Sequence, residues 1–300
     1  MRQVYSARKL LALFILVMSA GLGSNGCQQD AQVKQRPPVT LEPPWVVLYA
    51  FDAEGEKLRD WIPLNADTVW AGRRIATGRL VQPVVLAASG MGMSNAAATA
   101  QYVIDRYRPK GIIFTGICGA LDPQLHIGDI VIPGRWITHD YGHWGKQGFR
   151  TDSIPVGRTD SVGFDLRWDL PVDTNLFRLI NEAADRIDFR FEMVAQRLPE
   201  VHIGGIGVSG DAFIDSRDKR MELQNEFQAQ IVDMESAAVV QTAHANGVPV
   251  VVIRSCSDLA GGSGSETASA ELNDFSSVAA QNSALVVREF LENPEEPPGP

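Results

Sequence analysis

Residues 231–260 read IVDMESAAVVQTAHANGVPVVVIRSCSDLA, a helical pattern followed by a buried strand. Small and apolar residues recur near the 3.6-residue period from Ala237 to His244, which predicts a helix that ends before Gly247. The unbroken apolar run 250–253 predicts a strand that is covered on both faces. A helix followed directly by such a strand is typical of an α/β domain.

Two carboxylates bracket this stretch. Glu235 lies where a strand gives way to the helix, and Asp258 lies just past the end of the next predicted strand. Open α/β sheets bind their ligands outside the carboxyl ends of strands, so both acids are expected at the same edge of one sheet. Position alone leaves two other interpretations open. A carboxylate also complements the positive end of a helix, and aspartate is common in turns.

The composition excludes several classes of protein. The chain has 300 residues and a hydrophobic content of 45%, which is enough apolar material for a sizeable core. Its net charge of −9 argues against a nucleic-acid partner. Cys118 and Cys256 fall near the ends of predicted buried strands and are expected to be packed thiols. The cysteines have no C-x-x-C spacing, so a cysteine-based zinc site is not expected. We expect no metal and no other cofactor.

The first 26 residues have the three-part pattern of an export signal. A basic start precedes the apolar stretch 10–18 and the small, polar stretch 19–26. An uncleaved N-terminal anchor helix is the alternative. Cys27 follows Ser24-Asn25-Gly26, which resembles a bacterial lipoprotein processing site, although an aliphatic residue is usual where Ser24 stands. The sequence therefore predicts an exported, periplasmic protein, with lipid anchorage to a membrane through Cys27 as a hypothesis.

The remaining chain divides into a tether (27–44), one domain (45–292) and a disordered tail (293–300). The tether is polar and contains four prolines, which is typical of unpacked chain. Strands are expected at 45–50, 84–88, 111–115, 130–133, 201–208 and 250–253, with a hairpin or two short strands within 68–80. Helices are expected at 96–107, 174–187, 218–227 and 272–292. Their alternation predicts a three-layer α/β domain.

Two long segments are expected to be irregular. Residues 135–173 are rich in glycine, aspartate, arginine and aromatic residues, and residues 259–271 have the glycine- and serine-rich composition of a lid. Long loops in compact domains are usually functional or take part in interactions.

Glycines and acids follow several of the predicted strands. The turn at 90–95 leads from a strand into a helix, a geometry that points backbone amides at an anion or a sugar. Its glycine spacing is not the dinucleotide fingerprint. Glu54 follows the first strand in a cluster of three acids, which could equally be a solvated helix start.

Six motifs together resemble the nucleoside phosphorylase and nucleosidase superfamily, and most closely its 5′-methylthioadenosine/S-adenosylhomocysteine nucleosidases. The resemblance covers nearly all of residues 45–292. The motifs are Ser89-Gly90-Met91-Gly92 with Asn95, Thr115-Gly116-Ile117-Cys118-Gly119-Ala120-Leu121, Gly128-Asp129-Ile130-Val131, Ser209-Gly210-Asp211-Ala212-Phe213-Ile214, Met234-Glu235, and Arg254 with Ser257-Asp258. The resemblance implies a single three-layer αβα domain with a mixed central sheet.

The resemblance also implies a reaction, the cleavage of a purine N-glycosidic bond. Asp258 matches the general acid that protonates the leaving purine, a role worth about 10²–10⁴ in rate. That role requires burial to raise its pKa. Glu235 matches the carboxylate that binds the ribose hydroxyls. The matching substrate-binding positions are Met234 against the sugar, Phe213 stacked on the purine, Ile214 at the purine edge, Ser257 and Arg254 as supports, and Gly90 in the glycine turn.

The attacking nucleophile is either water or phosphate. Glu54 stands where the hydrolases carry the carboxylate that activates water, and it would repel a phosphate dianion by roughly a few kcal/mol at about 4 Å. The strand before Gly116 contains no arginine to hold phosphate. These features favour hydrolysis. Ile117 replaces the serine of the intracellular nucleosidases, which puts water positioning in doubt.

Two alternatives stay open, a purine nucleoside phosphorylase and a non-catalytic nucleoside-binding or storage protein on the same fold. The expected small-molecule partner is a purine nucleoside such as 5′-methylthioadenosine or S-adenosylhomocysteine. By resemblance we also expect a homodimer, with residues 135–173 as a candidate interface.

Overall fold

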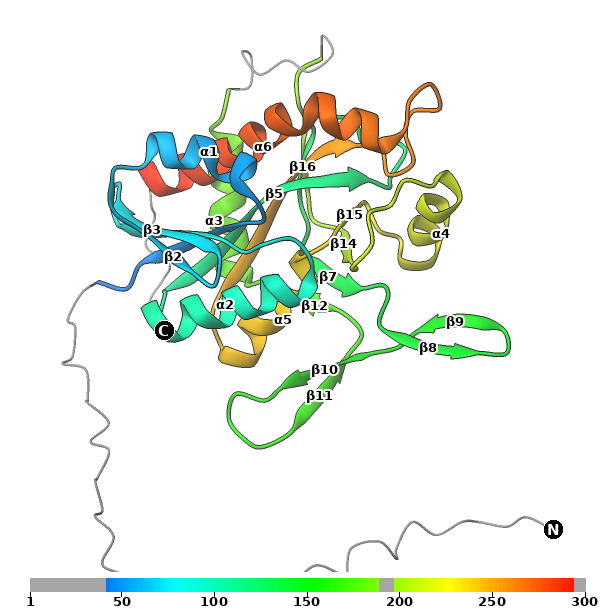
Figure 1. Cartoon of the computed structure of the whole chain (residues 1–300), viewed down its shortest axis with the longest axis horizontal. Helices are drawn as coiled ribbons and strands as arrows, with labels where there is room; N and C mark the ends of the chain where they lie inside the picture. Colours follow the sequence, from blue (N-terminus) through cyan, green and yellow to red (C-terminus); the bar gives the residue numbers. More distant parts are fainter. Residues whose placement is uncertain (1–41, 189–196, 294–300) are drawn as a thin grey trace, which may run out of the picture. The chain divides into compact units, whose positions relative to one another are not determined.

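A large mixed β-sheet, covered by helices on both faces, forms the centre of the protein (Figure 1). The computed structural model describes residues 42–188 and 197–293. The predicted export signal, the tether up to residue 41 with its Cys27, and the tail from residue 294 lie outside the described residues. Within the described residues, strands and helices alternate as predicted, and the α/β class is confirmed.

The sheet is built around one long strand, β5 (Gly111–Ala120). Both β1 and β16 pair with it in parallel, and β15 pairs antiparallel with its last two residues. The sheet is therefore mixed. From one edge to the other the strands are β12 (Leu170–Pro171), β7 (Arg135–Thr138), β14 (Ile206–Ser209), β15 (Ile231–Asp233), β5, β1 (Trp45–Tyr49), β4 (Pro83–Ala88), β3 (Arg73–Arg79) and β2 (Leu64–Trp70). Off this path, β16 (Val250–Asp258) also pairs with β6 (Ile130–Ile132), which pairs with β13 (Val201–Ile203).

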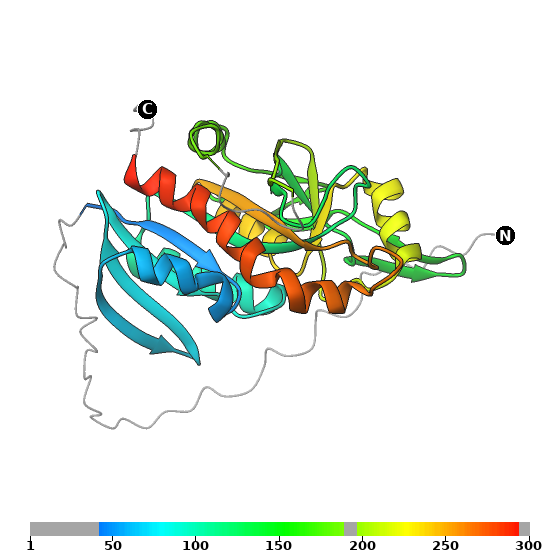
Figure 2. The same ribbon diagram turned by 90° about the horizontal axis from the view of Figure 1, so that it is seen from above.

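Alternate side chains of the central strands pack under different helices, because successive residues of a strand point to opposite faces. In β1, Val46 and Leu48 pack with α2 (Met93–Tyr107) and α5 (Ser236–Asn246). Val47 and Tyr49 pack with the helices of the other face, which are α1 (Asp52–Trp61), α3 (Thr174–Asp185) and α6 (Ala268–Glu292). Figure 2 shows α6 lying beside α1.

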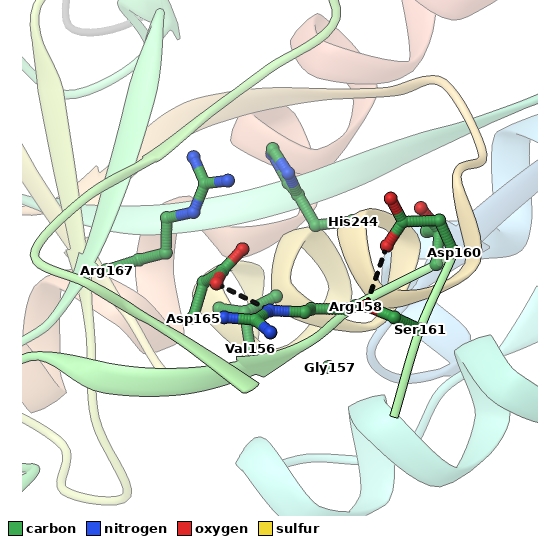
Figure 3. Close-up of a pocket in the computed structure, with 9 residues that line it drawn as sticks. Val156, Gly157, Arg158, Asp160, Ser161, Asp165, Arg167 and His244 are labelled. Carbon is green, nitrogen blue, oxygen red and sulfur yellow. Dashed lines mark hydrogen bonds and ion pairs between the residues drawn. The ribbon is translucent and has the colours of Figure 1, made fainter. Parts of the chain in front are cut away.

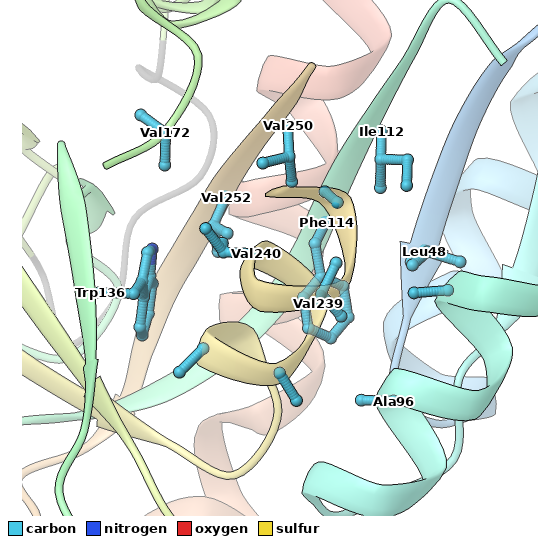
Figure 4. Packing of buried hydrophobic residues seen from close by; sticks show 14 of the residues in the cluster. Leu48, Ala96, Ile112, Phe114, Trp136, Val172, Val239, Val240, Val250 and Val252 are labelled. Atoms are coloured by element: carbon cyan, nitrogen blue, oxygen red, sulfur yellow. The ribbon is translucent and has the colours of Figure 1, made fainter. Parts of the chain in front are cut away.

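The buried side chains form one hydrophobic cluster on each face of the sheet, and the cluster on the α2 and α5 face is the larger. Figure 4 shows Phe114 and Val252 beside Val239 and Val240 of α5, whereas Leu48 lies toward Ala96 of α2. A third, smaller cluster joins α4 (Arg217–Phe227) to the sheet, and its buried members include Ile137, Val208, Val232, Leu223 and Phe227. Among the described residues, no helix combines the length and apolar character needed to cross a membrane.

The prediction of an irregular segment at 135–173 is wrong. Strands β7 and β12 join the main sheet, and two hairpins lie between them. These hairpins are β8 (Gly142–Gly145) with β9 (Gly148–Thr151), and β10 (Ile154–Gly157) with β11 (Phe164–Arg167). In Figure 1 both hairpins extend away from the main sheet.

Several predicted boundaries also need correction. Strand β5 continues through its glycines to Ala120, since β16 pairs with it in parallel as far as Gly119, with one register shift between Cys256 and Asp258, and β15 pairs with Gly119 and Ala120. Asp258 is therefore the last residue of β16 and does not lie beyond it. The predicted strand 201–208 is two strands, β13 and β14, separated by Gly204 and Gly205, whose φ angles are +90° and +75°. Helix α6 begins at Ala268, inside the predicted lid segment.

Candidate active site

Two of the carboxylates singled out in the sequence, Glu54 and Glu235, come together around one buried guanidinium. Arg254 on β16 has no exposed surface. Its Nε donates to Asp233 Oδ2 at 2.9 Å. Its Nη1 lies 3.7 Å from Glu54 Oε1, and its Nη2 lies 3.9 Å from Glu235 Oε2. A single cation therefore contacts three acids from three elements, which are Asp233, Glu54 and Glu235.

The Arg254 guanidinium also makes a cation–π contact and a hydrogen bond to a hydroxyl group. Its carbon lies 4.1 Å from the centre of the Phe114 ring, within the range of a cation–π contact. Nη2 donates to the Ser236 hydroxyl at 2.9 Å. Nη1 has no hydrogen-bond partner among the described residues. This buried donor faces Glu54 Oε1, so its contact there is an ion pair at 3.7 Å.

Asp233 is the residue of this cluster that the sequence analysis missed. It is 7% exposed and accepts hydrogen bonds from Arg254 and from the Ser209 hydroxyl, the latter at 2.5 Å. It also accepts from the amides of Glu235 and Ser236 at 3.2 and 3.1 Å, and from the Ser236 hydroxyl. A charged residue inside the buried strand Ile231–Asp233 is the signal that could have identified it, because buried carboxylates need partners.

Glu54 is buried in the first turn of α1, with 2% of its surface exposed. Its Oε2 accepts from the Ala50 amide at 2.5 Å and its Oε1 from the Ile117 amide at 2.8 Å. Burial raises the pKa of this carboxyl, and the nearby Arg254 opposes that rise. The alternative of a solvated helix start is therefore wrong for Glu54.

The glycine at position 116 makes this arrangement sterically feasible. A Cβ at Gly116 would lie 2.1 Å from Arg254 Nη1 and 2.3 Å from Glu54 Oε1. Ile117, which replaces the expected serine, contributes its backbone amide to Glu54. The amide is independent of side-chain identity, so this contact survives the replacement.

Glu235 immediately precedes α5. Its carboxylate accepts a hydrogen bond from a backbone amide in the glycine turn that follows β4. The Gly92 amide donates to Glu235 Oε1 at 2.8 Å. Burial, followed by the negative charge of Asp233, raises the pKa of Glu235 to about 7. The neighbouring amides of the turn also have protein partners, because Gly90 donates to the Ala50 carbonyl and Met93 to Asp211 Oδ1.

Asp258 occupies a separate, adjoining position at the end of β16. It is 2% exposed, and burial raises its pKa to about 6. The Ala260 amide donates to its Oδ1 at 2.9 Å. The Ser257 hydroxyl lies 2.9 Å from Asp258 Oδ2 and 3.2 Å from the Cys118 carbonyl. A hydroxyl has one proton, so both contacts are hydrogen bonds when Ser257 donates to the carbonyl and a protonated Asp258 donates to Ser257.

A small cavity of about 30 Å³ adjoins Asp258. Phe213, Ile214 and Met234 line it, together with Gly119, Ala212, Val232 and Asp233. Phe213 is 45% exposed, which leaves much of an aromatic ring open to a stacking partner. The acid and three of the predicted substrate-binding residues therefore share one cavity.

Comparison with known proteins identifies the family of the chain. A sequence profile described as "Phosphorylase superfamily" matches residues 45–292. The chain belongs to the phosphorylase superfamily.

Relatives within the phosphorylase superfamily include nucleosidases. The 5′-methylthioadenosine/S-adenosylhomocysteine nucleosidase of Mycobacterium tuberculosis is 34% identical over 216 residues, which span 69% of this chain and 80% of the relative. The corresponding nucleosidase of Staphylococcus haemolyticus is 32% identical over 210 residues, spanning 70% of this chain and 81% of the relative.

Solved structures confirm the superfamily fold. The nucleosidase of Neisseria meningitidis, in complex with methylthio-immucillin-A, superposes with a TM-score of 0.70 and 28% identity, covering 84% of this chain and 99% of that one. Futalosine hydrolase of Helicobacter pylori superposes with a TM-score of 0.67 at 22% identity, over 83% and 98% of the two chains, which supports the shared fold alone.

A second and larger hollow in this superfamily member is lined by none of Glu54, Asp233, Glu235 and Asp258. Its volume is about 420 Å³, and Figure 3 shows it between hairpin β10–β11 and His244 of α5. Charged side chains such as Arg158 and Asp165, which form an ion pair at 2.8 Å, line much of it. It contains none of the predicted site residues. Within residues 42–188 and 197–293, no three histidine, cysteine or acidic side chains are grouped as a metal site would require.

Proposed function

We propose that this protein hydrolyses the N-glycosidic bond of a purine nucleoside such as 5′-methylthioadenosine or S-adenosylhomocysteine. The observation that carries the proposal is Asp258, a buried acid with a pKa of about 6 in the wall of the cavity that Phe213 and Ile214 line. A carboxyl with a pKa near the working pH can both hold and release a proton. The named substrates are those of the relatives that match the chain.

Asp258 acts on the leaving base. As the bond from the sugar carbon to the purine nitrogen breaks, its electron pair moves to the purine, and Asp258 transfers its proton to a ring nitrogen. Ser257 holds the carboxyl from one side and the Ala260 amide from the other. Phe213 stacks on the purine, and Ile214 contacts its edge. Protonation makes the purine a better leaving group, which is the source of the rate gain.

The acids around Arg254 act on the sugar. The breaking bond leaves positive charge on the ribosyl group, and Glu235 binds the ribose hydroxyls while Met234 packs against the ring. The Glu235 carboxylate already accepts a hydrogen bond from the Gly92 amide. This bond fixes the orientation of the carboxylate before substrate binds. Preorganised negative charge of this kind stabilises a developing cation at little reorganisation cost.

Water completes the reaction by adding to the sugar carbon, and Glu54 accepts the proton that the water loses. Two features favour water over phosphate. Glu54 is a buried carboxylate at the nucleophile position. In addition, the amides of Gly90, Gly92 and Met93, which could have held a phosphate, already donate to protein groups. The products are the free purine and the 5′-substituted ribose.

The test measures free base released from 5′-methylthioadenosine, S-adenosylhomocysteine, adenosine, inosine and guanosine, each with and without phosphate. We expect release that does not require phosphate. Asp258→Asn and Glu54→Gln are each expected to lower kcat/KM by about 10²-fold or more, because each removes a proton-transfer group. Glu56→Gln is the matched control, since Glu56 lies in the same helix and is exposed.

Two outcomes would contradict the proposal. Release that depends on phosphate would mean a phosphorylase and would remove the role given to Glu54. Binding of nucleosides without release of base from any of them would mean a binding or storage protein.

We further propose that the protein is a homodimer that associates through hairpins β8–β9 and β10–β11. Large apolar side chains are exposed on and beside these hairpins, namely Tyr141, Trp144, Val162, Phe164, Leu166 and Trp168. Large apolar side chains that are exposed to this extent favour a protein–protein interface.

We also propose that residues 1–26 direct export to the periplasm and that Cys27 carries a lipid anchor, with residues 27–44 as a tether to the catalytic domain, 45–292. The three-part pattern of the first 26 residues supports this. In a bacterial host the full chain is expected in the membrane fraction, and Cys27→Ser is expected to appear in a soluble fraction. Recovery of the unaltered protein from the cytosol would rule out both proposals.

A further inference from the structure

The loop between the catalytic strand β16 and helix α6 is held by one buried carboxylate. Glu271, in the first turn of α6, is 2% exposed. Its Oε2 accepts from the Leu259 amide at 2.9 Å, and its Oε1 accepts from the Ser263 amide at 2.8 Å. The two oxygens thus bind two different points of a loop whose first residue follows Asp258 directly.

The segment that Glu271 fixes has a demanding backbone. Ala260 is fully buried and has a φ of +48°, a left-handed conformation that is unfavourable for any residue other than glycine. Its amide is the donor that contacts Asp258 Oδ1. Such a conformation persists only where surrounding contacts determine it, and the bond from Leu259 to Glu271 is adjacent to it in the chain.

We propose that Glu271 is a positioning residue for the general acid, which holds the Leu259–Ala260 backbone so that the Ala260 amide fixes the Asp258 carboxyl. This inference rests on the proposed function of Asp258. Glu271 does not touch the cavity beside Asp258, whose lining residues come from other segments. Its effect on catalysis is therefore transmitted through the backbone of the loop and through its charge.

The negative charge of Glu271 and the burial of Asp258 both raise the pKa of Asp258. Burial is the main cause of the raised pKa of Asp258, and the negative charges of Glu271 and Asp215 add to it. The Ala260 amide and Ser257 oppose it. Arg220 of α4 also interacts with Glu271. Removing the charge of Glu271 therefore lowers the pKa of Asp258, so that the acid loses its proton at a lower pH.

Glu271→Gln separates this role from a general structural one. Glutamine has nearly the same shape but one acceptor oxygen, so one of the two loop amides loses its partner. We expect kcat on 5′-methylthioadenosine to fall about tenfold or more, a loss typical of a hydrogen bond to a charged group, with a smaller change in KM. The alkaline limb of the kcat/KM–pH profile is expected to move to lower pH.

Two further variants make the test decisive. Asp274→Asn removes the same charge from an exposed position one turn further along α6 and is expected to match the unaltered protein. Glu271→Asp keeps the charge but shortens the side chain, so its kcat is expected to fall while its alkaline limb stays close to that of the unaltered protein. If Glu271→Gln unfolds at the assay temperature, Glu271→Asp decides the question by its kinetic constants: a fall in kcat with little change in KM supports the inference, and an unchanged kcat overturns it.

A Glu271→Gln enzyme with unchanged kcat, or with a lowered kcat and an unmoved alkaline limb, would overturn the inference. An unaltered protein that releases no base from any nucleoside would instead overturn the proposed function, so the two failures are distinguishable.

Discussion

The raised pKa of Glu235 has a consequence for the stability of the protein. Its pKa is about 7 in the folded protein, against 4.5 for an ordinary glutamate. The folded state therefore keeps a proton that the unfolded chain releases between these values. The stability contributed by protonated Glu235 is complete below pH 4.5 and is lost as the pH rises through 7.

Glu235→Gln is expected to remove this pH dependence, because glutamine does not titrate. Between pH 4.5 and 7 the free energy of unfolding of the unaltered protein should fall by roughly 3 kcal/mol more than that of the variant. Urea unfolding at half-unit pH steps measures the difference, with exposed Glu56→Gln as the control. Parallel curves for the unaltered protein and Glu235→Gln would contradict the assignment.

At the residue scale, the sequence predicts site residues well where an acid follows a predicted strand. Glu54, Glu235 and Asp258 were predicted from such positions, and the structure buries all three. Asp233 and the amide of Ile117 were not predicted. Their roles depend on strands distant in the sequence, β15 and β5, lying against the same arginine on β16.

Strand β5 shows how an element can be constrained by the site that it carries. It passes between β1 and β16 and brings Gly116 opposite Arg254 in the parallel register. A side chain at this position would collide with both partners of the Arg254–Glu54 contact. The glycine-rich sequence of β5 is therefore a packing requirement, in a strand where glycine would otherwise weaken the sheet.

Gly116→Ala is expected to destabilise the protein by about 1–3 kcal/mol, the usual cost of overpacking a close-packed interior. It should also lower nucleosidase activity, because Glu54 and Arg254 must move apart. Gly134→Ala is the control, since the nearest atom to a Cβ there is 3.9 Å away. Equal thermal stability of the two variants would show that the site tolerates the extra methyl group.

At the element scale, long periodic helices were predicted to within a few residues, whereas residues 135–173 were wrongly expected to be irregular. The strands there have two to four residues. A two-residue period needs more positions than this to stand out from chance. Hairpins of this length are determined by turn geometry and cross-strand contacts, which composition does not reveal.

At the scale of the whole molecule, the two hairpins that extend from the domain both carry exposed apolar side chains. Trp144 is 80% exposed and Leu166 is 74% exposed, each on a strand that belongs to a two-stranded sheet of its own. Hairpin β10–β11 is anchored to the domain, because Ile154 and Val156 of β10 are buried in the core beside α5. An isolated two-stranded hairpin is marginally stable in water, so burial of Trp144 against a second copy would stabilise hairpin β8–β9, which is the physical reason for expecting the proposed dimer.

Trp144→Ser combined with Leu166→Ser is expected to convert the dimer to a monomer in sedimentation equilibrium at micromolar concentration. Val69→Ser is the control, because Val69 is 75% exposed on edge strand β2, outside both hairpins. A monomer at all concentrations for the unaltered protein would contradict the proposed dimer.

The two ends of the described domain meet across one aromatic contact. Trp45, the first residue of β1, packs edge-on against Phe290 near the end of α6, with ring centres 5.0 Å apart. Figures 1 and 2 both place the start of β1 and the end of α6 on the same side of the domain. A circular permutant could therefore join residue 293 to residue 42 through a short linker and begin the chain afresh within the turn of hairpin β10–β11. The order in which the elements are synthesised would change, while the arginine and its three acids would keep their neighbours.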